Sequence, residues 1–549
     1  MRAIVLISLG LGPSIAIADG PEASVGNASK AAPNLAADTT VPPAQPAPGP
    51  AQDALQQKIE PKTAKPEAKQ SETRKAPEAA PKPAADKTVW GFPGSWRGAY
   101  EADSGIAGAP GMTRFNDAKR QRFTGGARFT SGDLAGAVKI AIYAYDGISV
   151  GDADKSLIRP AELRQGWLSW RSPYGLFRFG ATENKWGLGI VSGGRSAYDQ
   201  LTHDFTYRVG SDVTAGLTYG LKLGRIGAAL SGAMVLRDEN ATLTKGDRAA
   251  QGVGLVRYSV DKRRWAGLYA AYRSQTDADG SDLTVLAIDL AGAWEGALGA
   301  ADRWRIAFEA ANLMGSTDRM LSEAAFAAGR DTMDLSAQGA AMIAGFDLLN
   351  RKLAVELEGG YASADRNPED DKLTRFSFDR GHQVGMILIP SLLRHVHEAA
   401  VERAEDPSRV AQGPHGLKHL KSKALTAGVT YINPRVSWRV GSGSVRGGLH
   451  LGAIIAGLPQ GSADPYMSFR RGTPTNPFGG APDTALGSEL NIGLTTAIKL
   501  RRRYALGLSL EGAAAQPGAA YADATGNAPG LITMLRTGFA LRALEKEAK

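Results

Sequence analysis

The sequence predicts an all-β fold, a transmembrane antiparallel β-barrel of about 18 strands with long extracellular loops. Three observations predict it. Apolar and polar residues alternate with a period of two, tight links alternate with long connections, and no stretch of about eighteen apolar residues follows Trp90. A barrel turns one face of each strand toward lipid and the other toward a wet lumen, so it requires this alternation.

The N-terminus has the layout of a secretory signal. Residues 1–19 combine one early Arg, an apolar run and Ala-Ile-Ala before Asp19. A membrane anchor is the alternative, but Gly10, Gly12 and Pro13 break the run and it is short for a spanning helix. The chain has no Cys, which excludes thiolate catalysis, Cys-based metal sites and a lipoprotein attachment cysteine.

Residues 20–88 are rich in Ala, Pro and Lys, with few aliphatic residues and no aromatic residue. Such a segment buries too little to fold, so we expect a disordered linker in the periplasm. It is a plain spacer or contacts a periplasmic partner, and no motif supports the second alternative. Residues 89–549 are the predicted barrel.

The net charge is +9 and the pI about 9.4. A basic balance does not by itself indicate nucleic-acid binding, and no helical basic face supports it. The basic residues are spread singly through alternating segments instead.

Five segments show the alternation most clearly. In each, aliphatic or aromatic residues occupy every second position, and small, polar or charged residues occupy the positions between them. We call the odd or even set to which a residue belongs its parity. They are residues 138–143, 304–309, 353–358, 490–499 and 504–511.

The connections predict the direction of the barrel. Tight links alternate with long ones, and bacterial barrels have short periplasmic turns and long outer loops. An even strand number also brings both ends of the barrel to the periplasm, as an N-terminal linker there requires. The tight links are 130–133, 171–174, 223–225, 260–264, 349–352, 440–444 and 501–503, and the longest connections are 184–211, 314–335, 363–424, 459–485 and 516–529.

Residues 384–389 are apolar but would break the alternation of connections if they formed a wall strand. We therefore place them inside the long connection 363–424 and predict an amphipathic helix over 391–405. This helix either folds into the lumen and restricts it or caps the surface, and the sequence does not separate these alternatives.

Tryptophans lie near the expected strand ends. One ring edge of Trp is polar, so headgroup depth favours it, and a membrane belt is preferred over buried core positions. The residues are Trp96, Trp167, Trp170, Trp265, Trp304 and Trp438.

If the aliphatic face lies outside, charged residues line the lumen. Rings of Arg and Lys lower the barrier for anions. Alternatively, Arg–carboxylate pairs only stiffen the lumen. The predicted basic residues are Arg97, Arg128, Lys139, Arg178, Lys222, Arg257, Arg305, Arg435, Arg439, Arg446, Lys499 and Arg536, with Arg542 on the same parity; the predicted acidic residues are Glu309, Glu356 and Glu358, with Glu101, Asp289 and Glu511 on the same parity.

One loop concentrates oxygen ligands at Asp365, Asn367, Asp370 and Asp371. Calcium prefers such donors, but the spacing differs from the twelve-residue calcium loop, so a solvated acidic turn is favoured. We expect no other cofactor and no metal. The Ser and His residues form no nucleophile pattern, and no phosphate-binding loop is present, so we expect no enzyme activity.

Two segments resemble a known family. They are GYASADRNPEDDKLTRFSFDRG, residues 360–381, and ENKWGLGIVSGG, residues 183–194. They resemble bacterial outer-membrane barrels similar to the alginate-export channel, although Ala364 stands where that family usually has Gly. The resemblance implies an export or diffusion pore of about 18 strands.

The sequence thus leaves two functions open. The first is an outer-membrane channel for anionic or polyhydroxylated solutes, among them an exported polysaccharide. The second is a structural barrel whose loops and linker bind partners. Both place the chain in the bacterial outer membrane, in contact with lipid and lipopolysaccharide.

Overall fold

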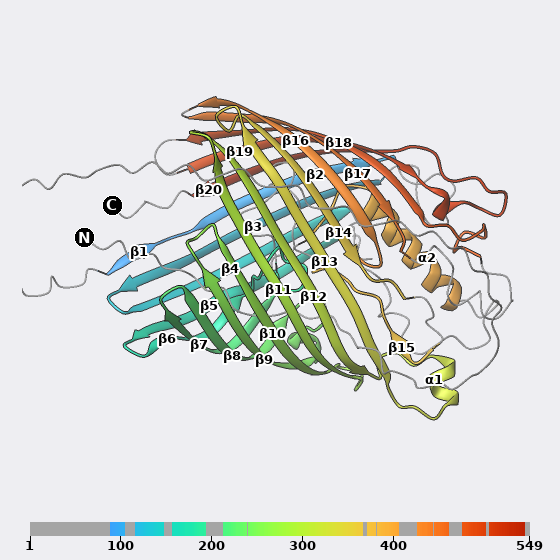
Figure 1. Ribbon diagram of the computed structural model, residues 1–549, viewed down its shortest axis with the longest axis horizontal. Coiled ribbons are helices and arrows are strands. Elements are labelled where there is room, and N and C mark those ends of the chain that lie inside the picture. The colour runs from blue at the N-terminus through green and yellow to red at the C-terminus, as the bar shows by residue number, and fades with distance from the viewer. Residues whose placement is uncertain are drawn as a thin grey trace, which may run out of the picture. The chain divides into compact units, whose positions relative to one another are not determined.

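A closed ring of antiparallel strands makes up the computed structural model (Figure 1). Neighbouring strands pair along the chain from β2 to β14 and from β16 to β20, β14 pairs with β16, and β20 pairs back onto β2. The described residues are 88–104, 116–147, 156–193, 212–238, 240–365, 370–379, 382–405, 425–442, 444–459, 475–500 and 504–543. The predicted signal and almost all of the predicted linker therefore lie outside them.

Of the twenty strands in the described residues, β1 (Val89–Gly91) and the two-residue β15 (Lys372–Leu373) lie outside the ring, which leaves 18. The prediction of an all-β barrel of this size is confirmed. The ring strands are β2 (Gly94–Asp103), β3 (Asn116–Ser131), β4 (Leu134–Gly147), β5 (Ser156–Ser172), β6 (Gly175–Glu183), β7 (Val213–Leu223), β8 (Ile226–Arg237), β9 (Arg248–Ser259), β10 (Trp265–Thr276), β11 (Asp282–Leu298), β12 (Asp302–Thr317), β13 (Met333–Leu348), β14 (Leu353–Ala362), β16 (Thr430–Ser442), β17 (Val445–Gly457), β18 (Ala485–Leu500), β19 (Tyr504–Pro517) and β20 (Ile532–Ala543).

Short helices occur only in the connections of the described chain. They are α1 (Glu323–Ala327), α2 (Arg394–Glu405), a π-helix (Leu388–Leu393) and two 3-10 turns (Leu243–Lys245 and Ala519–Tyr521). Among these residues no helix has the length and apolarity to cross a membrane.

The tight and long connections fall at opposite ends of the ring, as predicted. All the tight links join strands at the end where β2 begins and β20 ends, which we call the short-turn end. In Figure 1 this end is on the left, and α1, α2 and β15 lie at the other end, the loop end. Several strands are longer than the ten or so residues expected for a membrane crossing; β5 and β11 each have 17 residues.

The two faces of the sheet differ as the alternation predicts. Large aliphatic side chains of one parity are exposed, for example Leu168, Leu230 and Ile455, whereas the opposite parity carries most of the charged residues. One apolar cluster identifies the inner face, because it joins Leu255 on β9 to Met534 on β20 through connecting segments. Strands so far apart in the ring share a compact cluster only across the interior.

The tryptophan prediction is correct in part. Trp96, Trp170, Trp304 and Trp438 are exposed on the outward face, as a belt requires. For Trp167 and Trp265 the prediction is wrong, because both share the inward parity of their strands. Each has a guanidinium over its ring, Arg178 at 4.5 Å and Arg257 at 4.2 Å, and this cation–π contact suits an inward position.

Candidate functional site: the charged lumen

Cationic side chains form a ring inside the short-turn end of the barrel. Each has the inward parity and lies within the last four residues of its strand at that end. Ten strands contribute, so the ring extends around the barrel. We call this set the basic collar; it comprises Arg97, Arg128, Arg178, Lys222, Arg257, Arg305, Arg439, Arg446, Lys499 and Arg542.

Several collar residues keep an uncompensated charge. Lys222, Arg446 and Lys499 are exposed and make no ion pair with the described part of the chain. Arg439 and Arg305 share Asp347, at 3.2 and 3.4 Å. Arg305 also pairs with Glu356, so these two guanidinium groups face two carboxylates and are compensated, unlike Lys222, Arg446 and Lys499.

A pocket of about 310 Å³ lies within the collar. Arg439, Arg446 and Arg542 line it together with the neutral polar residues Thr495 and Thr496. Guanidinium groups bind carboxylates through two parallel hydrogen bonds, and hydroxyls suit sugar-like groups. The lining therefore fits a small anion that carries hydroxyl groups.

The other three predicted basic residues lie deeper and are paired. Lys139 pairs with Glu183 on β6 at 2.8 Å. Arg536 bridges Glu101 on β2 and Glu511 on β19, at 2.8 and 3.4 Å, across the seam that closes the ring. These side chains hold the wall together, so the stiffening alternative applies to them.

Arg435 is the third paired residue. It contacts Glu358 at 2.5 Å and Glu356 at 3.4 Å, and all three side chains are buried. Because two carboxylates face this one guanidinium, Arg435 adds no free positive charge to the lumen. Arg435 therefore belongs to the paired wall and not to the exposed cations of the collar.

Residues 184–193, the first inserted segment, follow β6 and pack inside the wall formed by β9 to β12. Trp186 stacks on Tyr269 with ring centroids 5.7 Å apart. The Glu309 carboxylate on β12 accepts the backbone N–H groups of Gly189, Ile190 and Val191 at 2.7, 3.1 and 3.2 Å. Glu309 is thus on the inner face, as predicted, but it binds the chain itself.

Residues 382–393, the second inserted segment, contain the apolar stretch that the sequence left undecided. Leu388, Leu392 and Leu393 are fully buried in the inner cluster, and α2 continues from them. Glu489 on β18 accepts the N–H groups of Met386, Ile387 and Leu388 at 2.6, 3.0 and 2.5 Å. Of the two alternatives, the structure shows a segment folded against the inner wall.

His382 connects both inserted segments to the wall. Its Nε2 atom lies 2.9 Å from the Tyr431 hydroxyl and 3.1 Å from Glu358, and its Nδ1 atom lies 3.3 Å from the Leu188 carbonyl oxygen. The Asp379 N–H donates to the Ile190 carbonyl at 2.9 Å. The two inserted segments therefore form one body within the described lumen.

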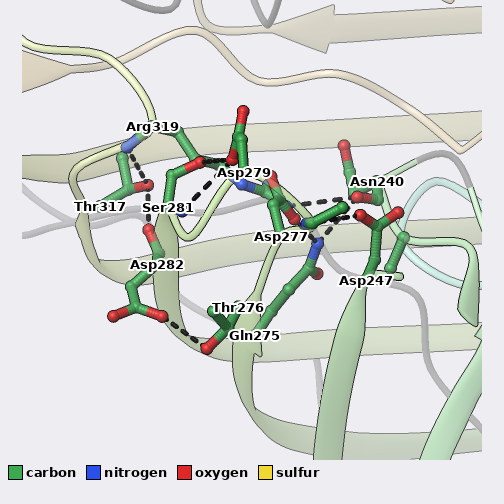
Figure 2. A network of polar contacts seen from close by, with 12 residues as sticks. Asn240, Asp247, Gln275, Thr276, Asp277, Asp279, Ser281, Asp282, Thr317 and Arg319 are labelled. Atoms are coloured by element: carbon green, nitrogen blue, oxygen red, sulfur yellow. Dashed lines mark hydrogen bonds and ion pairs between the residues drawn. The ribbon is translucent and has the colours of Figure 1, made fainter. Parts of the chain in front are cut away.

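At the loop end, a polar network joins the connections that follow β8 and β10 to the end of β12 (Figure 2). Arg319 pairs with Asp277, the Gln275 amide donates to the Asn240 carbonyl at 2.8 Å, and the Ala278 N–H donates to Asp247 at 3.1 Å. These bonds tie neighbouring connections to one another, so this part of the rim continues the wall.

The proposed loop cation site is not assembled in the described residues. Asp365 accepts the Thr374 N–H at 3.3 Å, Asp370 accepts the Lys372 N–H at 2.8 Å, and Asp371 pairs with Arg330. Asn367 lies outside the described residues. No group of three or more His, Asp or Glu side chains in the described chain could hold a metal ion. The contacts of Asp365, Asp370 and Asp371 are those of an acidic turn, the alternative that the sequence favours.

The histidines of α2 show no metal geometry either. The His395 ring packs against Phe478 at a tilt of 35°, with ring centroids 5.3 Å apart. Burial, and secondarily the nearby Arg375, holds the pKa of His397 well below its usual value. Both facts describe packed, neutral side chains; His415 and His419 lie outside the described residues.

Comparison with known proteins identifies no family. No family model and no curated protein matches the chain, so the resemblance to the alginate-export family stays a prediction. Among solved structures, Pseudomonas aeruginosa OccK2 has a TM-score of 0.46 at 10% identity, covering 83% of this chain and 98% of that one. Acinetobacter baumannii OccAB1 has 0.43 at 9% identity, covering 83% and 97%. These similarities concern the arrangement of strands and do not bear on the solute.

Sequence reasoning missed two features of this site. It did not single out Glu489, although its parity matches that of Asn491 and Lys499, and it did not assign Glu309 a partner. The available signals were glycines beside apolar residues at Gly187, Gly189 and Gly385, since such positions let backbone N–H groups converge.

Proposed function

We propose that the protein is a channel of the bacterial outer membrane that passes anionic or polyhydroxylated solutes. The outward aliphatic face would meet lipid and lipopolysaccharide, and the short-turn end would face the periplasm, where the N-terminal linker would lie. An exported polysaccharide remains one of the solutes that the family resemblance implies.

The basic collar supports this proposal most strongly. Inward cations on ten strands create a positive potential at one level of the lumen, which concentrates anions and repels cations. The Debye length at physiological salt is about 8 Å, so the field of an exposed charge is largely screened beyond that distance. Lys222, Arg446 and Lys499 therefore act on solutes that enter the collar rather than at long range.

The collar pocket indicates the chemistry of the solute. Its guanidinium groups suit a carboxylate, and the Thr495 hydroxyl, which contacts His450 Nε2 at 2.8 Å, lies at the same level. A uronate combines a carboxylate with several hydroxyl groups, so glucuronate is a suitable probe.

The test is ion selectivity in planar bilayers. In a potassium chloride gradient we expect the native protein to show an anion-selective zero-current voltage, which glucuronate reduces by competing for the collar. The variant R446E/K499E should shift the voltage toward cations because it reverses two uncompensated charges. Lys262→Glu, in an exposed turn outside the lumen, is the control.

Two results would argue against the proposal. If the native protein and the charge-reversed variant had the same zero-current voltage, the collar would not determine the ion selectivity of the pore. A folded barrel that never conducts would favour the structural barrel with partner-binding loops.

A further inference from the structure

Two glutamates of the barrel wall hold the two inserted segments in the same way. Glu309 accepts three successive N–H groups of residues 189–191, and Glu489 accepts three successive N–H groups of residues 386–388. Both side chains are 1% exposed. The glutamates lie on β12 and β18, on separate parts of the ring, and neither pairs with a cation in the described chain.

Glycines make each arrangement sterically feasible. Gly187 and Gly189 have φ values of +52° and +81°, and Gly385 has +74°, in the left-handed region that favours glycine. Left-handed residues let consecutive N–H groups converge on one anion. A Cβ at Gly385 would lie 3.0 Å from both Glu489 carboxylate oxygens, and one at Gly187 would overlap Glu309.

Around residues 189–191 and 386–388 the carboxylates supply hydrogen-bond acceptors that the surrounding apolar side chains cannot offer. Ile190, Val191, Leu388 and Ile389 are almost fully buried among apolar residues. Without the glutamate, three buried N–H groups at each site would lose their acceptor, which is unfavourable. A carboxylate that accepts several N–H bonds forms the stronger, charge-assisted type of hydrogen bond.

We propose that Glu309 and Glu489 are positioning residues that set the free cross-section of the pore. By holding the inserted segments on the wall, they determine the largest solute that passes. This inference rests on the proposed channel function, but it concerns size rather than charge and involves residues outside the collar.

We call each set of hydrogen bonds, from Glu309 to residues 189–191 and from Glu489 to residues 386–388, a latch. The two latches act on one body, because the inserted segments contact each other. The Asp379 N–H donates to Ile190 and His382 lies against the Leu188 carbonyl. Release of either segment therefore removes contacts from the other. We expect the double variant E309A/E489A to change the pore by less than the sum of the single changes.

The experiment compares single-channel behaviour of E309A and E489A with that of the native chain. Loss of three charge-assisted hydrogen bonds should raise the fraction of time spent in a larger-conductance state by about tenfold or more. Liposome swelling should admit larger neutral oligosaccharides. Glu511→Gln is the matched control, since Glu511 is a buried glutamate of the wall that pairs with Arg536 instead of accepting the N–H groups of residues 189–191 or 386–388. Glu489→Gln keeps one oxygen acceptor and should be intermediate.

A substitution in the inserted segment, at the glycine that faces Glu489, tests the same contact. Gly385→Ala introduces a Cβ 3.0 Å from both Glu489 carboxylate oxygens and 2.5 Å from Ile454 Cδ1 in a left-handed backbone, so the segment must shift away from Glu489 and the variant should reproduce the E489A phenotype. Combined with E489A it should add little, because both changes disrupt one interaction. If the effects of the two changes on conductance were fully additive, the proposed contact between Gly385 and Glu489 would be contradicted.

Hydrogen exchange separates failure of the latch from failure of the proposed function. Backbone amides of residues 189–191 should exchange faster in E309A, and those of 386–388 faster in E489A, while the barrel keeps its heat-modifiable band. Unchanged exchange overturns the latch, as does faster exchange with unchanged conductance and size limit. If neither native nor variant protein conducts, the channel function fails and the role in pore size fails with it, whatever the exchange rates.

Discussion

At the short-turn end of the barrel, Lys222, Arg446 and Lys499 are exposed and have no ion-pair partner among the described residues, whereas Glu309 and Glu489 are buried and accept three N–H groups each. The first set can act on a passing solute because its charge is not compensated. The carboxylates of the second set are already occupied by hydrogen bonds to the backbone of the chain itself. The comparison teaches that inward parity alone does not make a charged residue part of the solute path.

The same contrast exists between two arginines on neighbouring strands. Arg435 is enclosed by Glu356 and Glu358, while Arg446 faces the collar pocket. Removing the first leaves the buried Glu358 carboxylate without its arginine, whereas Glu356 keeps its contact with Arg305. Removing the second leaves no buried charge.

Arg435→Met should therefore produce the largest effect on stability, a loss of about 3–5 kcal/mol in the free energy of unfolding. Arg446→Met should change it by no more than about 0.5 kcal/mol while weakening anion selectivity. Urea unfolding in detergent, followed through the heat-modifiable band, measures the first quantity, and the zero-current voltage measures the second. Equal destabilisation by both variants would abolish the distinction between paired wall and free collar.

Thiol labelling would establish which compartment the collar faces. The chain has no Cys, so a single introduced cysteine reports cleanly. We expect a cysteine at Asp261, in a short turn, to resist an impermeant reagent in intact cells, and one at Ala324, at the loop end, to react. Ala324 is exposed, whereas the adjacent Ala325 is only 1% exposed and would be a poor reporter. The reverse pattern would place the collar at the cell surface.

Removal of the linker should have the smallest effect. Deleting residues 20–85 takes away a segment too poor in apolar residues to join a core. We expect an unchanged heat-modifiable band and unchanged selectivity. Loss of the folded band would show that the segment contributes to the barrel and would limit the comparison above to the intact chain.

Local patterns were enough to predict the wall. Alternation at residues 353–358 and 490–499 identified strands and the direction of their side chains, because the two-residue period of an extended chain is a local property. The lengths of connections identified the two ends of the ring. The same parity placed Lys222, Arg446 and Lys499 inside, and it also placed Arg435 there without showing which contacts Arg435 makes.

Only the closed ring decided those contacts. Gly189 and Glu309 are 120 positions apart in the sequence, and Met386 and Glu489 are 103 apart. Their meeting depends on the register of all the intervening strands, which brings distant wall positions and inserted segments to the same place. Sequence alone therefore determined which residues face inward, and the tertiary structure determined whether each inward charge is free or is bound by the chain itself, because pairing depends on distances across the lumen that no local pattern records.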